Sequence, residues 1–135
     1  MMTSIALAGL LATTGVVRTE PVLLFSSDAI KVARSAATEW NHGPLPKNAA
    51  FDIPDGPTKL QPGYFAVHYL VGVNPVMTIW INLTTGQVVE PDRCLYFTGH
   101  EVRTFSAAIR KLTGARPMRL DRLANDIGCD ALKAD

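Results

Sequence analysis

Two alternating runs in the middle of the chain constrain its fold more than any other feature. They read YFAVHYLV over residues 64–71 and VMTIWINL over residues 76–83, and the four residues GVNP at 72–75 separate them. Both runs alternate with the period of two that is typical of β-strands. A connection this short joins antiparallel neighbours, because parallel strands need a much longer crossover. The sequence therefore predicts a β-hairpin.

The alternation divides the hairpin into two faces. The odd-numbered residues form an apolar face: Phe65, Val67, Tyr69, Val71, Met77, Ile79, Ile81 and Leu83. The even-numbered residues form a mixed face: Tyr64, Ala66, His68, Leu70, Val76, Thr78, Trp80 and Asn82. Directly opposed residues of an antiparallel pair point to the same side, so registers that mix odd with even positions are excluded. Two registers remain, with His68 opposite either Trp80 or Thr78.

The segments around the hairpin complete the predicted sheet. A third strand at residues 87–90 follows Thr84-Thr85-Gly86, where glycine tolerates the positive φ of a short hairpin loop. Residues 41–63 are rich in proline and glycine and read as a long loop, in which residues 49–53 can form a short edge strand. An antiparallel β-meander of three to four strands is expected.

Three segments have helical periodicity. Residues 25–43 repeat alanine on one stripe, as in a helix that lies close against a sheet, and Asn41 and Gly43 are expected to end this helix. A second helix follows Thr98 as its expected N-cap and ends at Gly114. A third covers residues 119–127. The inward stripe expected for the second helix is Val102, Phe105, Ala108, Ile109 and Leu112. The predicted fold class is α+β, with one N-terminal helix, the meander, and two C-terminal helices packed on the sheet, all helices on one face.

The N-terminus bears on the compartment. Residues 5–17 carry no charge and are mostly apolar or small, which matches the apolar region of a signal peptide and is too short to span a membrane. We therefore expect residues 1–20 to be a signal peptide or a hydrophobic N-terminal segment, and residues 21–135 to form a single α+β domain. The mature chain is expected to be periplasmic or secreted, with no stable membrane span. A buried N-terminal strand or helix in a cytoplasmic protein is the alternative.

The two cysteines, Cys94 and Cys129, have three interpretations. In an exported chain they are expected to form a disulfide, and in a cytoplasmic chain they are two buried thiols. The third interpretation makes Cys94 a nucleophile with His100, six residues later, as its base. Nothing in the spacing forces these two residues together, so no catalytic residue is predicted.

The mixed face of the hairpin supplies the candidate binding residues. Tyr64, His68, Thr78, Trp80 and Asn82 combine aromatic surface with hydrogen-bonding groups, which is typical of surfaces that bind a ligand or a partner. The structural alternative is that helices or the proline-rich loop cover this face. The carboxylates at the corner after the third strand, Glu90 among them, are expected to be solvated.

Metal, cofactor and nucleic-acid sites are not indicated. His42, His68 and His100 lack the spacing of a zinc site, and two cysteines are too few for a four-cysteine site. The C-terminal third is rich in basic residues: Arg103, Arg110, Lys111, Arg116, Arg119 and Arg122. Its last helix has no recognition helix after it, acidic residues are interspersed, and the formal net charge is only +1. No metal, no cofactor and no nucleic-acid partner are therefore expected.

The central segment, residues 64–90, resembles the hairpin of PepSY-type and related cystatin-like small domains. The features that carry this resemblance are strand alternation and the turn Thr85-Gly86-Gln87-Val88 into the next strand. Those domains commonly have an acidic residue before the turn, where this chain has Asn82 and Leu83. The two C-terminal helices are not part of the pattern. The resemblance implies an exported, non-catalytic module that binds or inhibits a partner.

The sequence thus predicts a small exported bacterial domain without catalysis that acts by binding a protein or a ligand. The alternatives are a small enzyme that uses His68 or the Cys94/His100 pair, and a cytoplasmic subunit of a protein complex. A protein partner is expected, and the oligomeric state is left open.

Overall fold

The computed structural model describes residues 26–54 and 63–134, so the predicted signal segment, residues 1–20, lies outside the described residues. It confirms the α+β class. The elements are α1 (Ser26–Asn41), β1 (Ala49–Asp52), β2 (Tyr64–Val71), β3 (Asn74–Asn82), β4 (Val88–Glu90), β5 (Leu95–Tyr96), α2 (His100–Thr113), α3 (Leu120–Ile127) and β6 (Lys133–Ala134).

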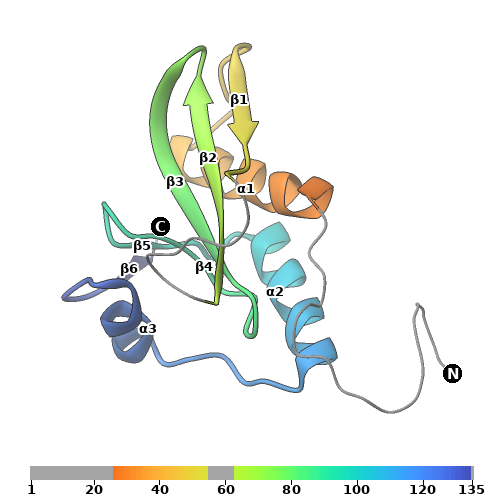
Figure 1. The fold of residues 1–135 in the computed structure, drawn as a ribbon, viewed down its shortest axis with the longest axis vertical. Helices are drawn as coiled ribbons and strands as arrows, with labels where there is room; N and C mark the ends of the chain where they lie inside the picture. The colour runs from red at the N-terminus through yellow and green to blue at the C-terminus, as the bar shows by residue number, and fades with distance from the viewer. Residues whose placement is uncertain (1–25, 55–62, 135) are drawn as a thin grey trace, which may run out of the picture.

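The strands form one sheet in the order β1-β2-β3-β4-β5-β6 (Figure 1). All neighbours are antiparallel except β5 and β6, which are parallel. The predicted meander corresponds to β2, β3 and β4, with the expected edge strand β1 beside β2. The two-residue strands β5 and β6 extend the sheet beyond the predicted three to four strands.

The hairpin adopts the second of the two registers left open by the sequence. His68 lies opposite Thr78, and the pairing runs from Tyr64 opposite Asn82 toward the turn. The turn is shorter than expected, because Asn74 and Pro75 belong to β3. Gly72 has φ +64°, as the first central residue of a type II′ hairpin turn requires.

A β-bulge interrupts the strict odd-to-odd pairing near the turn. Tyr69 pairs with Met77, but Leu70 pairs with Pro75, so β3 has one extra residue, Val76. Such an insertion bends the strand and increases its twist. The parity rule therefore holds from residue 64 to residue 69 and fails beyond it.

The odd-numbered face of the sheet packs against α1 and α2. The buried residues of this core are Ala29, Val32, Ala33, Ala36, Ala37, Val67, Tyr69, Met77, Ile79, Ile81, Val88, Phe97 and Val102. Four of the five α1 residues are alanines, whose short side chains let the helix lie close to the strands. The predicted alanine stripe is confirmed.

The third helix lies on the opposite face, which corrects the expectation that all helices share one face. Leu123, Ala124 and Ile127 of α3 pack with Tyr64 and Val89 of the sheet in a second, smaller core. Figure 1 shows α3 beside β5 and β6, apart from α1 and α2. A helix therefore covers the mixed face at one end of the sheet, as the structural alternative to a binding surface had it.

The start of α2 differs from the prediction. Gly99, not Thr98, is the N-cap, and no side chain of the helix itself caps it. The Glu39 carboxylate of α1 takes this role, because it accepts hydrogen bonds from the N–H groups of Thr98 (2.9 Å) and Gly99 (2.7 Å). This contact fixes α2 relative to α1, and it could not be inferred from local spacing.

The inward stripe of α2 is also rotated relative to the prediction. Val102, Ser106 and Ile109 are buried, whereas Ala108 is exposed and Leu112 is 71% exposed. The reason is that Ser106 faces the turn between β3 and β4, where its hydroxyl donates to the Gly86 carbonyl (2.6 Å). With Ser106 at the centre of the buried stripe, Ala108 and Leu112 face outward.

Candidate functional site

The five predicted binding residues divide into two groups. Tyr64, Trp80 and Asn82 lie at the end of the mixed face beside α3, and the rings of Tyr64 and Trp80 are 5.7 Å apart between centroids. Tyr64 and Asn82 are buried and Trp80 is half-buried. His68 and Thr78 lie opposite each other farther along the hairpin, where both are half-buried. Their role as one ligand-binding face stays a prediction.

A pocket opens where Tyr64 and Asn82 meet α3 and the segment that precedes it. Its volume is about 570 Å³, and we call it the α3 pocket. The polar residues that line it are Tyr64, Asn82, Thr84, Thr85, Arg116, Arg119, Arg122 and Asp126. Two of the predicted binding residues thus lie in a cavity, together with three arginines that the sequence had indicated only as part of a diffuse basic region.

Gln87 holds one wall of the α3 pocket in place. Its side chain is 1% exposed, and its amide pairs in both directions with the backbone of Met118. Gln87 Nε2 donates to the Met118 carbonyl (3.0 Å), and the Met118 N–H donates to Gln87 Oε1 (2.9 Å). This two-bond contact fixes the segment between α2 and α3 against the sheet, because a buried amide needs both of its polar atoms satisfied.

Asn82 shapes the floor of the same pocket. Its Oδ1 accepts hydrogen bonds from the N–H groups of Thr84 (2.9 Å) and Thr85 (2.8 Å), which forms an Asx turn. Asn82 is only 7% exposed. The asparagine that belongs to a glycosylation-like Asn-Leu-Thr triplet therefore has a structural role in the β3–β4 turn.

Tyr64 and Asp126 form the polar contact between sheet and helix. The Tyr64 hydroxyl donates to Asp126 Oδ2 at 2.7 Å. Burial raises the pKa of the Tyr64 hydroxyl, and the neighbouring Asp126 carboxylate raises it further. The hydroxyl therefore stays protonated as a donor, and the Asp126 carboxylate is engaged within the protein.

The arginines of the α3 pocket differ in whether they pair with an acidic side chain. Arg119 Nη2 lies 3.2 Å from Asp121 Oδ2, and both side chains are largely exposed. Within residues 26–54 and 63–134, no acidic side chain pairs with Arg116 or Arg122. Both of these arginines are exposed, so their guanidinium groups are available to an incoming anion.

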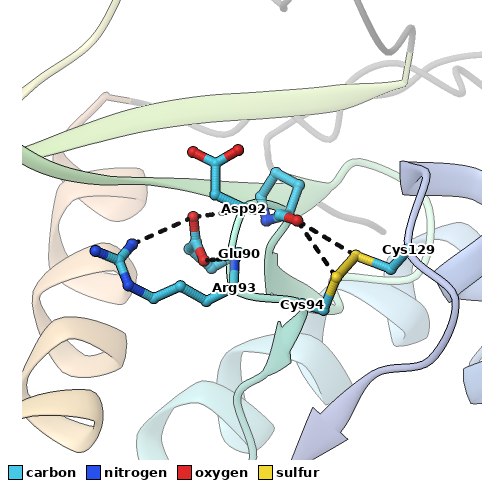
Figure 2. The surroundings of a disulfide bond; sticks show 6 residues. Glu90, Asp92, Arg93, Cys94 and Cys129 are labelled. Carbon is cyan, nitrogen blue, oxygen red and sulfur yellow. Dashed lines mark hydrogen bonds and ion pairs between the residues drawn. A yellow bond between two sulfur atoms is a disulfide. The ribbon is translucent and has the colours of Figure 1, made fainter.

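The disulfide between Cys94 and Cys129 is confirmed. It joins the residue before β5 to the residue after Gly128, which ends α3, across a sequence separation of 35. The Pro91 carbonyl oxygen lies 3.5 Å from Cys94 Sγ and 3.3 Å from Cys129 Sγ (Figure 2). Neither sulfur carries a proton in a disulfide, so these are close contacts without hydrogen bonding. The disulfide ties α3 to the corner after β4.

That corner is organised by a buried carboxylate, contrary to the expectation that its acids are solvated. Glu90 is fully buried and accepts hydrogen bonds from the N–H groups of Asp92 (3.2 Å) and Arg93 (2.7 Å). Its carboxylate also lies 3.6 Å from the Arg93 guanidinium (Figure 2). Burial nevertheless raises the pKa of Glu90, although these N–H groups and the Arg93 charge act in the opposite direction.

The raised pKa gives a testable pH dependence. The folded protein holds the Glu90 proton more tightly than the unfolded chain, so this stabilisation is present below about pH 4.3 and is lost as the pH rises through the folded-state pKa. Below about pH 4.3, the free energy of unfolding of Glu90→Gln should match that of the wild type within about 1 kcal/mol. As the pH rises, the variant should become the more stable of the two. Urea unfolding of both proteins across this range measures the difference, with exposed Asp130→Asn as control. The opposite trend, in which the wild type becomes more stable relative to Glu90→Gln as the pH rises, would contradict the raised pKa of Glu90.

The second candidate arrangement, Cys94 with His100, is not assembled. Cys94 is in the disulfide and carries no thiol to deprotonate. His100 begins α2 and lines a groove of about 390 Å³ between α1 and α2, where Ser35 donates a hydrogen bond to Glu101 (2.7 Å). A thiolate mechanism is therefore excluded while the disulfide is formed.

Two further features of the described residues bear on the predicted partners. Across residues 26–54 and 63–134, no three His, Cys, Asp or Glu side chains are grouped so that they could hold a metal ion. None of the helices in this part of the chain has the length and apolar character to cross a membrane.

The spacing of two arginines is the sequence signal for the α3 pocket. Arg119 and Arg122 are three positions apart where the chain enters a helix, which places their side chains on the same side of that helix. Arg116 precedes the helix, so this spacing does not place its side chain. Asp126 and Gln87 carried no such signal, because their roles depend on contacts with residues more than thirty positions away: Gln87 with Met118, Asp126 with Tyr64.

Comparison with known proteins adds one similarity in fold. No protein-family model matches the sequence, and no curated protein matches it. A chain in the structure of a type VI secretion system effector-immunity complex from Pseudomonas protegens has a similar fold, with a TM-score of 0.61. The two sequences are 19% identical, and the similarity covers 78% of this chain and 90% of that chain. At this identity the likeness concerns the fold alone, and the resemblance to PepSY-type domains stays a prediction.

Proposed function

We propose that this protein is a small exported bacterial domain that acts by binding a protein partner, without catalysis, and that the α3 pocket is its contact surface. The observation that carries the proposal is the pocket itself: an open cavity of about 570 Å³ lined by three arginines, of which Arg116 and Arg122 have no acidic partner among the described residues. Arginine is enriched where proteins bind one another.

Export is supported by the disulfide. Disulfides form and persist mainly in secreted and periplasmic proteins, because the cytoplasm keeps thiols reduced. The Cys94–Cys129 bond ties α3, and with it one wall of the pocket, to the sheet. An oxidising compartment would therefore favour the binding-competent state. A cytoplasmic subunit, the alternative, would be expected to keep both thiols reduced.

The nature of the partner is supported by the similarity in fold. The neighbouring structure is that of an effector-immunity complex, in which two proteins bind each other. We propose that this chain likewise works in a pair of proteins of this kind. The enzyme alternative depends on His68, which is half-buried opposite Thr78 and outside the α3 pocket.

Site-specific photocrosslinking in cells tests the proposal. Thr84 lines the α3 pocket and is exposed, so a photoreactive residue there reports on an occupant without removing an arginine. Val73 is the matched control, because it is 88% exposed at the opposite end of the hairpin, about 25 Å away along β2. A discrete protein adduct from position 84 and none from position 73 is expected. No protein adduct at position 84, or equal adducts at both, would overturn the proposal.

A further inference from the structure

We propose that the α3 pocket recognises an acidic segment of the partner protein, whose carboxylates bind Arg116 and Arg122. This inference rests on the proposed function and specifies the chemistry of the occupant. The guanidinium group presents donors in a planar fork that matches a carboxylate, and such charge-assisted bonds are stronger than neutral ones. The two exposed arginines at the pocket are therefore placed to receive carboxylates.

The acidic residues near the pocket do not satisfy these arginines. Asp126 accepts the Tyr64 hydroxyl at 2.7 Å, and Asp121 pairs with Arg119 and accepts its own helix's Arg122 N–H at 2.8 Å. Neither carboxylate is paired with the side chain of Arg116 or Arg122 among the described residues. The positive charge of these two side chains remains available to a ligand from outside.

The N-terminal end of α3 adds to the same preference. Its N-cap, Arg119, lies in an extended conformation and provides no side-chain cap. The positive end of the helix dipole lies at the pocket and favours negative charge there, of which Asp121 in the first turn supplies one. A helix terminus alone would not define a site, but here it coincides with the two available guanidinium groups.

The charge balance favours a protein segment over nucleic acid. Three arginines (116, 119 and 122) and two aspartates (121 and 126) leave a local formal charge of +1. Binding a phosphate backbone needs an extended row of basic residues that neutralises several phosphates. A pocket of this size with two available arginines suits one or two carboxylates instead.

Peptide binding tests this inference. The probe is a fluorescein-labelled ten-residue peptide of alternating glutamate and serine, titrated with the oxidised full chain and followed by fluorescence anisotropy. Arg116→Glu/Arg122→Glu is expected to weaken binding about tenfold or more, because attraction becomes repulsion at two positions. Arg103→Glu/Lys111→Glu makes the same change in net charge on the exposed side of α2, and less than about threefold loss is expected.

The inference would be overturned by no binding of the glutamate peptide at about 1 mM protein, by equal binding of a peptide with glutamine in place of glutamate, or by equal losses in both double variants. Tighter binding of a single-stranded oligonucleotide than of the peptide would also overturn it, in favour of a phosphate backbone. If the peptide does not bind but position 84 gives a protein adduct, the acidic occupant is wrong and the proposed function still holds. If neither peptide binding nor an adduct is found, both proposals are wrong.

Discussion

Loss of the Cys94–Cys129 disulfide is expected to lower the free energy of unfolding by about 4 kcal/mol, the largest effect of any single change proposed here. In the chain-entropy account, a cross-link across a separation of 35 residues restricts the unfolded chain by roughly this amount. The measurement is urea unfolding of the oxidised wild type and of Cys94→Ala/Cys129→Ala. Alanine suits position 94, because it keeps the strain of a non-glycine residue at φ +55° and removes only the bond.

Hydrogen exchange should show that the disulfide also restrains local opening of α3. Residues 123–127 of α3 are expected to lose more protection than the paired strands β2 and β3, because the disulfide lies directly after α3. Reductant should destabilise the wild type and leave the double variant unchanged. A loss below about 1 kcal/mol in the free energy of unfolding would contradict the role assigned to the bond.

Gly86→Ala is expected to cost about 3 kcal/mol or more. A Cβ at this position would lie 2.8 Å from Ser106 Cα and 2.9 Å from both the Ser106 carbonyl oxygen and Ile109 Cβ. These atoms belong to the packed face of α2, so either α2 or the turn must shift. The left-handed φ of +73° adds about 1–2 kcal/mol for any residue with a Cβ.

Gly114→Ala separates the steric contribution from the conformational one. Gly114 has nearly the same φ, +75°, but a Cβ there would meet no atom within 4 Å. It should therefore cost only about 1–2 kcal/mol. Thermal unfolding of both variants measures the difference, and equal losses would show that α2 does not pack on the β3–β4 turn as closely as described.

The hairpin shows how far alternation carries a prediction. Period-two patterning identified β2 and β3, their antiparallel pairing and a choice of two registers, because each register leaves the same side chains on the same face. It could not anticipate the extra residue Val76, since a bulge depends on how the strand must bend around the core. It also could not choose between Thr78 and Trp80 as the partner of His68.

The helices show where local patterns stop being informative. The α2 stripe was predicted from apolar residues alone, and Ser106 displaced it by bonding to the Gly86 carbonyl. The Glu39 cap on Gly99 joins residues 60 positions apart. Glu90 looked like a solvated corner acid, yet the tight turn needs a buried acceptor for its N–H groups. In each case a polar contact distant in sequence or hidden in a turn outweighed periodicity.

The candidate site was predictable only in part. Tyr64 and Asn82 were selected because they share a sheet face, and they do lie in the α3 pocket. His68 and Thr78 share that face as well but lie farther from α3, because the helix covers one end of the sheet only. The arginines could not be placed from the sequence, because the segment between α2 and α3 brings them to the pocket and Gln87 fixes the position of that segment.

The measurement that tests the central claim most directly combines the crosslinker with the arginines. A photoreactive residue at position 84 is placed in the wild-type chain and in the Arg116→Glu/Arg122→Glu chain, both expressed in the native host. The account predicts a discrete protein adduct from the first chain and its loss from the second, at equal levels of folded, oxidised protein. An adduct of equal yield from both chains would show that the pocket arginines do not recruit the partner, and no adduct from either would contradict binding at this surface.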